Sequence, residues 1–261
     1  MKGLAAAIRF LTIIPVPSGS AGRLTMTPWF PVAGVVVGLP VLATLALSGL
    51  IPRSEGGGIP LVFLPAVGAL LVWTAITGGL HEDGWADCAD AALAPVDQDR
   101  RREILKDPRV GVHGATALIL LLLVRFSALA SFAALPPGAR ELGLILVPPM
   151  VGRTAMVISL RAAEPLTAGG LGTALAAGAR PGLASVLTLV MVTGTVMWVG
   201  PHWLGPAALA VAGAAFVGLG IALFLSRRFG GLSGDGHGAT GIGTETATLV
   251  GLALALGGAA P

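Results

Sequence analysis

Three aspartates follow one another at helical spacing in GGLHEDGWADCADA, residues 78–91. Asp83, Asp87 and Asp90 are related as i, i+4 and i+7, so on a helix they lie within about 60° of one another. Like charges at that spacing repel, and a divalent cation would relieve the repulsion. Carboxylate oxygens without a cysteine or histidine cluster suit a hard ion, Mg²⁺ or Mn²⁺. We therefore predict that the three aspartates bind a metal; a solvated acidic loop is the alternative, and Glu82 points away from this face.

A basic segment, DRRREILKDPRVGVHG, follows at residues 99–114. Arginine and lysine bind phosphates, and the backbone amides of a glycine-containing turn approach an anion closely. Pro108 ends a helix, so its neighbours leave the helix rather than continue it. We predict a phosphate-binding segment; the alternative is that a basic loop only reports its side of a membrane. The residues predicted to form it are Arg100, Lys106, Asp107, Arg109, Gly111 and Gly114.

The third polar segment, residues 230–245, reads GGLSGDGHGATGIGTE. Its glycine content predicts that it does not form a regular helix. Asp235 follows Gly234 in this segment, which then leads into an apolar run. Because a linker between two spans needs no acidic residue, we predict that the segment brings Asp235 to the first carboxylate group. A flexible linker is the alternative.

The residues around these segments define the fold class. Of the 261 residues, 54% are hydrophobic and 11% are charged, against about 25% charged in soluble proteins. Several apolar runs reach the roughly 20 residues that cross a bilayer, which excludes a soluble domain. We predict an all-α polytopic membrane protein with one domain, residues 1–261, and an N-terminal interfacial helix that ends before Pro15 and Pro17. The seven predicted spans are 30–51, 59–80, 114–135, 142–160, 183–200, 204–225 and 243–260.

The lysines and arginines are distributed unevenly between the two sides of these spans. With the N-terminus inside, only Arg53 and Arg140 fall in outside segments. This bias predicts a cytoplasmic N-terminus and cytoplasmic polar segments. The net charge of +3 is then explained by the membrane topology and does not indicate nucleic-acid binding. The chain has a single cysteine, Cys88, which excludes an intrachain disulfide. The twelve basic residues of the inside segments are Lys2, Arg9, Arg23, Arg100, Arg101, Arg102, Lys106, Arg109, Arg161, Arg180, Arg227 and Arg228.

Two further arginines, Arg125 and Arg153, fall inside predicted spans. A charge within a span costs at least a few kcal/mol, so it normally faces the bundle interior and has a partner. Both side chains are within reach of the cytoplasmic face, where they would contact carboxylates or a substrate phosphate. A buried structural ion pair is the alternative.

Three ordered motifs resemble those of a known family. GGLHEDGWADCADA at 78–91, EILKDPRVGVHG at 103–114 and GGLSGDGHGA at 230–239 are similar to hallmark motifs of the cobalamin synthases, also called adenosylcobinamide-GDP ribazoletransferases. FLTIIPVP at 10–17 and FPVAGVVVG at 30–38 are similar to the family's N-terminal segment and first span.

The resemblance implies a Mg²⁺-requiring enzyme of the bacterial inner membrane that acts late in cobalamin (vitamin B12) biosynthesis. It implies that a ribose hydroxyl of α-ribazole, or of its 5′-phosphate, attacks the diphosphate of adenosylcobinamide-GDP and releases GMP. For this reaction we assign Asp83, Asp87 and Asp90 to one or two Mg²⁺ ions. Asp235 is a further ligand or the general base, and His81 is a weaker candidate for the base. We assign the motif glycines Gly84 and Gly234, the basic segment and Arg153 to substrate binding.

Two other function classes match parts of the pattern. A CDP-alcohol phosphotransferase of lipid synthesis would use the same metal chemistry, and a secondary transporter would place charges within its spans. The one-sided distribution of carboxylates favours an enzyme that works at the cytoplasmic surface. The 39 glycines also permit close helix packing between copies of the chain, so the sequence is compatible with a homo-oligomer.

Overall fold

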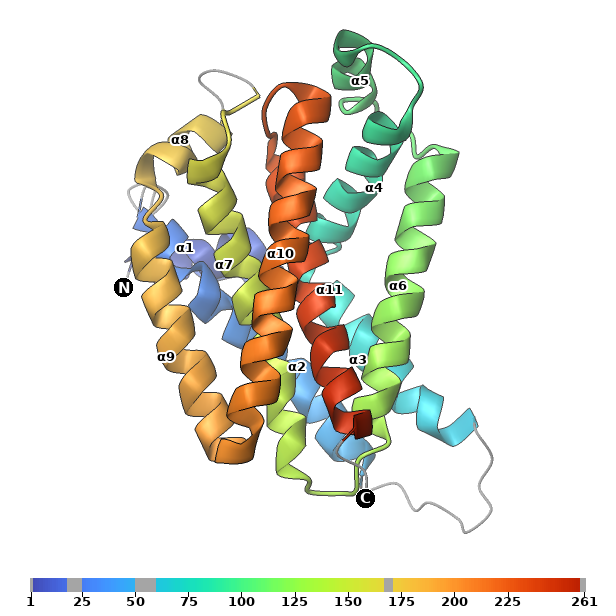
Figure 1. The fold of residues 1–261 in the computed structure, drawn as a ribbon, viewed down its shortest axis with the longest axis vertical. Coiled ribbons are helices and arrows are strands. Elements are labelled where there is room, and N and C mark those ends of the chain that lie inside the picture. Colours follow the sequence, from blue (N-terminus) through green and yellow to red (C-terminus); the bar gives the residue numbers. More distant parts are fainter. Residues whose placement is uncertain (1, 18–24, 50–59, 167–170, 259–261) are drawn as a thin grey trace.

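Figure 1 shows a bundle of long helices in the computed structural model, which describes residues 2–17, 25–49, 60–166 and 171–258. Within these ranges there is no β-strand, only an isolated bridge between Pro165 and Leu232, so the all-α class is confirmed. Arg23 and Arg53, used in the charge count, lie outside the described residues. The helices are α1 (Lys2–Leu11), α2 (Phe30–Ser48), α3 (Pro60–Thr77), α4 (Leu80–Leu93), α5 (Gln98–Ile104), α6 (Val112–Ala133), α7 (Val147–Ala162), α8 (Leu171–Gly178), α9 (Pro181–Val199), α10 (Leu204–Phe229) and α11 (Gly234–Gly258).

The long helices make this a multi-pass membrane protein. In the described part of the chain, 6 helices are long and apolar enough to cross a bilayer, or 7 if the bent pair α3–α4 counts as one span. These helices correspond to the predicted spans. The N-terminal helix α1 is also present and ends at Leu11, before Pro15 and Pro17, as predicted.

The prediction that residues 230–245 avoid a regular helix was wrong from Gly234 onwards, because α11 begins there. The last span is therefore longer than the predicted 243–260. Its glycines are contact points: a Cβ on Gly241 would lie 2.5 Å from the Met156 side chain, and one on Gly243 would lie 2.3 Å from Ile221. Close packing at these glycines offsets the roughly 1 kcal/mol that each glycine costs a helix. A helix is also favoured because, within a bilayer, the backbone must form its hydrogen bonds internally.

The α3–α4 bend turns the chain towards the polar end of the bundle. Gly78 and Gly79 adopt left-handed φ angles of 64° and 70°, a conformation that favours glycine, and the two helices meet at 87°. The amide of Asp83 donates to the carbonyl of Gly79, so α4 begins directly after the bend. The bend separates the apolar α3 from the acidic α4.

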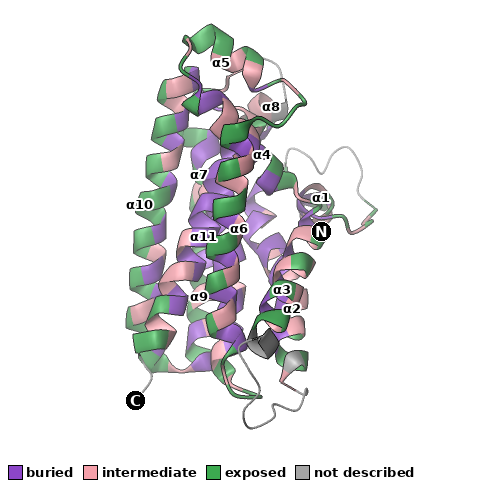
Figure 2. Ribbon diagram, turned by 90° about the vertical axis from the view of Figure 1, so that its right-hand side faces the viewer, coloured by how far each residue is buried: buried purple, intermediate pink, exposed green. Residues whose placement is uncertain are grey.

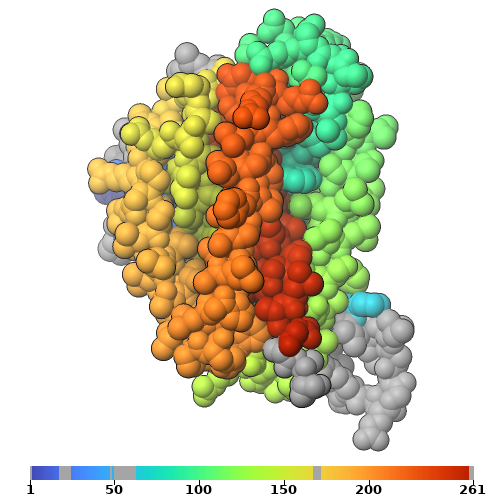
Figure 3. Space-filling model, viewed as in Figure 1, coloured from blue at the N-terminus to red at the C-terminus, as the bar shows by residue number. Residues whose placement is uncertain are grey.

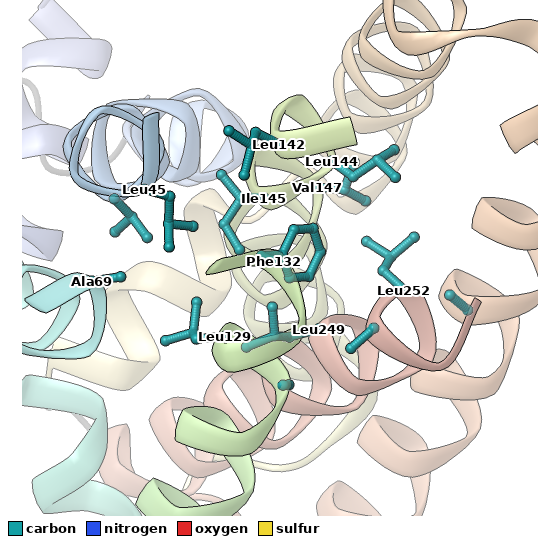
Figure 4. Close-up of a cluster of buried hydrophobic side chains, with 14 of the residues drawn as sticks. Leu45, Ala69, Leu129, Phe132, Leu142, Leu144, Ile145, Val147, Leu249 and Leu252 are labelled. Atoms are coloured by element: carbon teal, nitrogen blue, oxygen red, sulfur yellow. The ribbon is translucent and has the colours of Figure 1, made fainter. Parts of the chain in front are cut away.

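Two helices, α7 and α11, form the centre of the bundle. Figure 2 shows them mostly buried, whereas α6 and α10 have exposed outer faces, as expected for helices that contact lipid. α11 packs against α10, α7, α4 and α6, and Figure 3 shows α11 between α10 and α6. Figure 4 shows part of the core, where Leu129, Phe132, Leu144 and Leu249 are fully buried. The N-terminus of α11 is thereby fixed beside α4.

Candidate active site

The α4 helix carries the predicted carboxylates on one face. Glu82 and Asp83 lie in its first turn, where the helix dipole favours negative charge. Asp83 is exposed, whereas Asp87 and Asp90 are partly buried. No ion pair in the described ranges involves these three aspartates, and no described residue hydrogen-bonds the carboxylates of Asp83 and Asp87. Two aspartates on this face are therefore available to a ligand.

The start of α11 approaches α4 closely at Gly84. A Cβ on Gly84 would lie 3.0 Å from the Cα and carbonyl oxygen of Asp235, so only glycine permits this separation. Ser233 caps α11, since its hydroxyl accepts a hydrogen bond from the amide of Gly236 at 3.1 Å. The third polar segment thus brings Asp235 to the α4 carboxylates. Gly84, assigned to substrate binding, lies in this helix contact.

These carboxylates repel one another. The negative charge of Asp87 is opposed by partial burial and by the charges of Asp83, Asp235 and Asp90. In the described part of the chain, no three acidic, histidine or cysteine side chains converge tightly enough to enclose a metal ion. The aspartates supply only oxygen ligands, and too few of them to complete the coordination shell of an ion. Such a site fits Mg²⁺, which retains water and binds substrate phosphates. The donor chemistry therefore fits the predicted ion, with the remaining ligands supplied by substrate and water.

Asp90 has backbone partners that the carboxylates of Asp83 and Asp87 lack among the described residues. Its two carboxylate oxygens accept hydrogen bonds from the amides of Gly111 and Gly114 at 2.7 and 2.8 Å, at the start of α6. A Cβ on Gly114 would lie 2.2 Å from Asp90 Oδ2, so glycine is required there. The glycine turn does bind an anion closely, but in this structure the anion is Asp90. The same contact holds α4 against α6.

The basic segment forms an exposed arm beyond α4. Arg109 donates from Nε and Nη2 to the two oxygens of Asp107, at 2.9 and 2.6 Å. Hydrogen bonds from Arg109 lower the pKa of the Asp107 carboxyl to about 2. Arg100 pairs with Glu103 on the surface, and Lys106 has no acidic partner among the described residues. A bound phosphate would compete with the carboxylates of Glu103 and Asp107 for the two arginines, whereas Lys106 is free of an acidic partner among the described residues.

The two arginines within the spans share one buried carboxylate. Arg125 donates to Glu245 at 2.7 Å, and Arg153 donates to the other oxygen of Glu245. All three side chains are at most 3% exposed, and the Arg125 guanidinium lies 4.5 Å from the Trp73 ring centroid. The structure therefore shows the buried ion pair, one of the two alternatives for Arg125 and Arg153.

His81 and Glu82 face this buried ion pair rather than the aspartate face. His81 is 4% exposed and Glu82 is 6% exposed, and both interact electrostatically with Arg125, Arg153 and Glu245. His81 Nε2 and Glu82 Oε2 have no hydrogen-bond partner among the described residues. The charges nearest to His81 are therefore those of the buried ion pair, behind the carboxylate face.

Two cavities flank the carboxylates. The Asp83 pocket has a volume of about 570 Å³ and is lined by residues of the α3–α4 bend, including Glu82 and Asp83, and by Val110 of the basic segment. The His237 pocket has a volume of about 370 Å³ and includes Ser233 and Gly234, the neighbours of Asp235. Phe10 lines both pockets. Sequence reasoning missed these cavities, although Phe10 opens the FLTIIPVP segment.

Comparison with known proteins gives matches over nearly the whole chain. The family model described as cobalamin-5-phosphate synthase matches residues 3–253. The chain is 33% identical to a protein of Brevibacillus brevis named adenosylcobinamide-GDP ribazoletransferase, over 96% of this chain and 97% of that protein. A protein of Stutzerimonas stutzeri with the same name is 35% identical over 98% of this chain and 100% of its own length. No solved structure matches the chain.

Proposed function

Because the chain belongs to the cobalamin-5-phosphate synthase family, we propose that it transfers the cobinamide-phosphate part of adenosylcobinamide-GDP to a ribose hydroxyl of α-ribazole or of its 5′-phosphate. GMP is the second product. The observation that carries this proposal is the approach of Asp235 to the α4 aspartates between two separate cavities. A transfer between two substrates needs both to meet at one charged site in a fixed orientation.

The carboxylates that would hold Mg²⁺ are Asp83, Asp87 and Asp235. When bound, Mg²⁺ neutralises charge on the diphosphate and on the departing GMP. Asp90 adds its negative charge to this group while its oxygens keep the start of α6 in place. Of the four assigned aspartates, three therefore bind the ion, and Asp90 positions the start of α6 against α4.

Asp235 also lies where a base is needed. Its neighbours Ser233 and Gly234 line the His237 pocket, so a hydroxyl presented from that pocket is near its carboxylate. The alternative role of Asp235 is that of the general base, which accepts the hydroxyl proton as the oxygen attacks phosphorus. His81, the second candidate for the base, has a supporting role here because its neighbours are the buried charges of Glu245, Arg125 and Arg153.

The exposed arm recognises the phosphates of the donor. Lys106 is unpaired, and Arg109 directly precedes Val110, which lines the Asp83 pocket. Arg100 extends the same positive surface. Arg100 and Arg109 exchange their acidic partners for phosphate oxygens at small cost, because ion pairs at the protein surface contribute about 0–1 kcal/mol.

The site opens to the cytoplasm of a bacterial cell, with the protein in the inner membrane and its N-terminus inside. Support comes from the excess of lysine and arginine in the segments that carry the motifs. The arm α5 and the last turn of α10, with Arg227 and Arg228, lie at one end of the bundle, and the turn between α9 and α10 lies at the other (Figure 1). The partners of the protein are its two substrates and lipid, not nucleic acid.

The proposal is tested by GMP release in lipid nanodiscs. Asp83→Asn, Asp87→Asn and Asp235→Asn each reduce Mg²⁺-dependent release by at least about 100-fold. Asp99→Asn is the matched control, because Asp99 is an exposed acid of α5, and it retains wild-type activity. Full activity in all three site variants contradicts the proposed site. Release of CMP from CDP-diacylglycerol without GMP release, or a substrate-driven proton flux, contradicts the proposed reaction.

A further inference from the structure

A groove lies on the outer surface of the bundle between α9 and α10. Figure 1 shows these two helices meeting at one end and diverging towards the end that carries α5, with α7 between them. The groove has a volume of about 440 Å³ and is lined by α7, α9, α10 and α11, which belong to four of the candidate membrane spans. Its lining includes the exposed side chains of Ile158, Leu189 and Leu219, so the groove is open to the hydrocarbon of the membrane.

The groove suits an apolar ligand that is thinner than a helix. Hydroxyls that line it bond within the protein: those of Thr154 and Thr188 form a hydrogen bond with each other. Thr240 donates to the carbonyl of Gly236 at 2.8 Å. A helix with its side chains is about 10–12 Å across, so a volume of about 440 Å³ holds roughly one turn of it. A hydrocarbon chain is thin and flexible enough to fill the same space.

Positive charge gathers at one end of the groove. Arg161, at the end of α7, and Arg180, directly before α9, are exposed and have no acidic partner among the described residues. At a rise of about 1.5 Å per residue, they lie about 10 and 12 Å from the hydrogen bond between Thr154 and Thr188, and so at a similar depth. Glu164 is the one acidic residue in the sequence between them. The N-terminus of α9 has no side-chain cap, so its free amides add to the positive charge.

We propose that the α9–α10 groove binds one anionic phospholipid, with an acyl chain between the helices and the phosphate at Arg161 and Arg180. The proposed topology places this end of the groove in the cytoplasmic leaflet. Guanidinium groups form strong, charge-assisted hydrogen bonds with phosphate oxygens. A zwitterionic headgroup binds more weakly, because it brings an ammonium group towards the same arginines. The lipid is neither substrate of the proposed reaction, so this site is additional to that function.

The test measures lipid binding and does not depend on catalysis. Native mass spectrometry of the full chain in detergent gives dissociation constants for phosphatidylglycerol and for phosphatidylcholine with the same acyl chains. The wild-type protein binds one phosphatidylglycerol at least about tenfold more tightly than phosphatidylcholine. Arg161→Ala and Arg180→Ala each weaken phosphatidylglycerol binding by about fivefold, and the double variant removes the preference. Ala215→Trp places an indole in the groove and weakens the binding of both lipids by at least about tenfold.

Each kind of variant has a matched control. Arg140→Ala removes an exposed arginine between α6 and α7, at the opposite end of the bundle (Figure 1). Ala212→Trp adds an indole to an exposed position of α10 that does not line the groove. Both controls bind the two lipids as the wild-type protein does.

Three results overturn the proposal. The first is equal binding of the two lipids by the wild-type protein. The second is a preference for phosphatidylglycerol that persists when both arginines are replaced. The third is wild-type lipid binding by Ala215→Trp, or a two-copy species that this change abolishes, because the groove is then covered by a second copy of the chain. If Ala215→Trp does not fold, the arginine variants decide the outcome, since both side chains are exposed.

Discussion

Gly84→Ala tests the idea that the separation between α4 and α11 sets the geometry of the carboxylate group. The new methyl carbon would lie 3.0 Å from the Cα and carbonyl oxygen of Asp235, against 3.4 Å for an ordinary contact. Both atoms are backbone, so relief requires the helices to separate by about 0.4 Å. Overpacking costs about 1–3 kcal/mol, and the helix propensity of alanine returns up to about 1 kcal/mol. The protein therefore stays folded with a displaced Asp235.

A displacement of about 1 Å costs on the order of 100-fold in rate, so about 0.4 Å corresponds to a fivefold to tenfold loss. The assay is GMP release across a Mg²⁺ titration in nanodiscs, with folding checked by thermal denaturation. Gly194→Ala is the matched control, because Gly194 is a helical glycine of α9 with no atom near its added Cβ. Activity of Gly84→Ala within twofold of wild type would refute the reasoning.

Three further outcomes follow from the contacts at the site. Asp90→Ala leaves two amides unpaired and lowers the free energy of unfolding by about 1–3 kcal/mol, whereas Asp83→Ala, without such partners, does not; equal stability in denaturant unfolding contradicts this. Glu245→Gln leaves two buried arginines uncompensated, costs about 3–5 kcal/mol and lowers Tm by roughly 10 °C in thermal denaturation. Asp107 has a lowered pKa of about 2, so its ion pair with Arg109 is lost only as the pH falls through about 2 and Asp107 does not titrate between about pH 5 and 9. Asp107→Asn therefore keeps the shape of the rate profile over that range, and a new inflection in the variant's profile contradicts this prediction.

The local parts of the site were predictable because they depend on short-range spacing. The i, i+4, i+7 pattern of Asp83, Asp87 and Asp90 implies one helical face, and α4 provides it. The spans followed from apolar length alone, since a bilayer requires long, internally bonded helices. The arginines within spans signalled a buried partner for the same electrostatic reason.

The remaining features depend on contacts between distant segments. Glycine propensity argued against a helix at 234–245, but the packing of Gly241 on Met156 overrides propensity. Nothing local indicated that Glu245 would be the acid shared by Arg125 and Arg153, or that the glycine turn would bind Asp90. The His237 pocket combines residues from both ends of the sequence, and a single sequence contains no information on that contact.

The central claim is that Asp83, Asp87 and Asp235 together hold a divalent cation against the diphosphate of the donor. Electron paramagnetic resonance of Mn²⁺ bound to the protein with adenosylcobinamide-GDP measures this directly, because phosphorus nuclei near the ion produce a hyperfine coupling. We expect phosphorus coupling in the wild-type protein and in Asp99→Asn, and its loss in Asp83→Asn, Asp87→Asn and Asp235→Asn. An unchanged coupling in all three site variants would contradict the account.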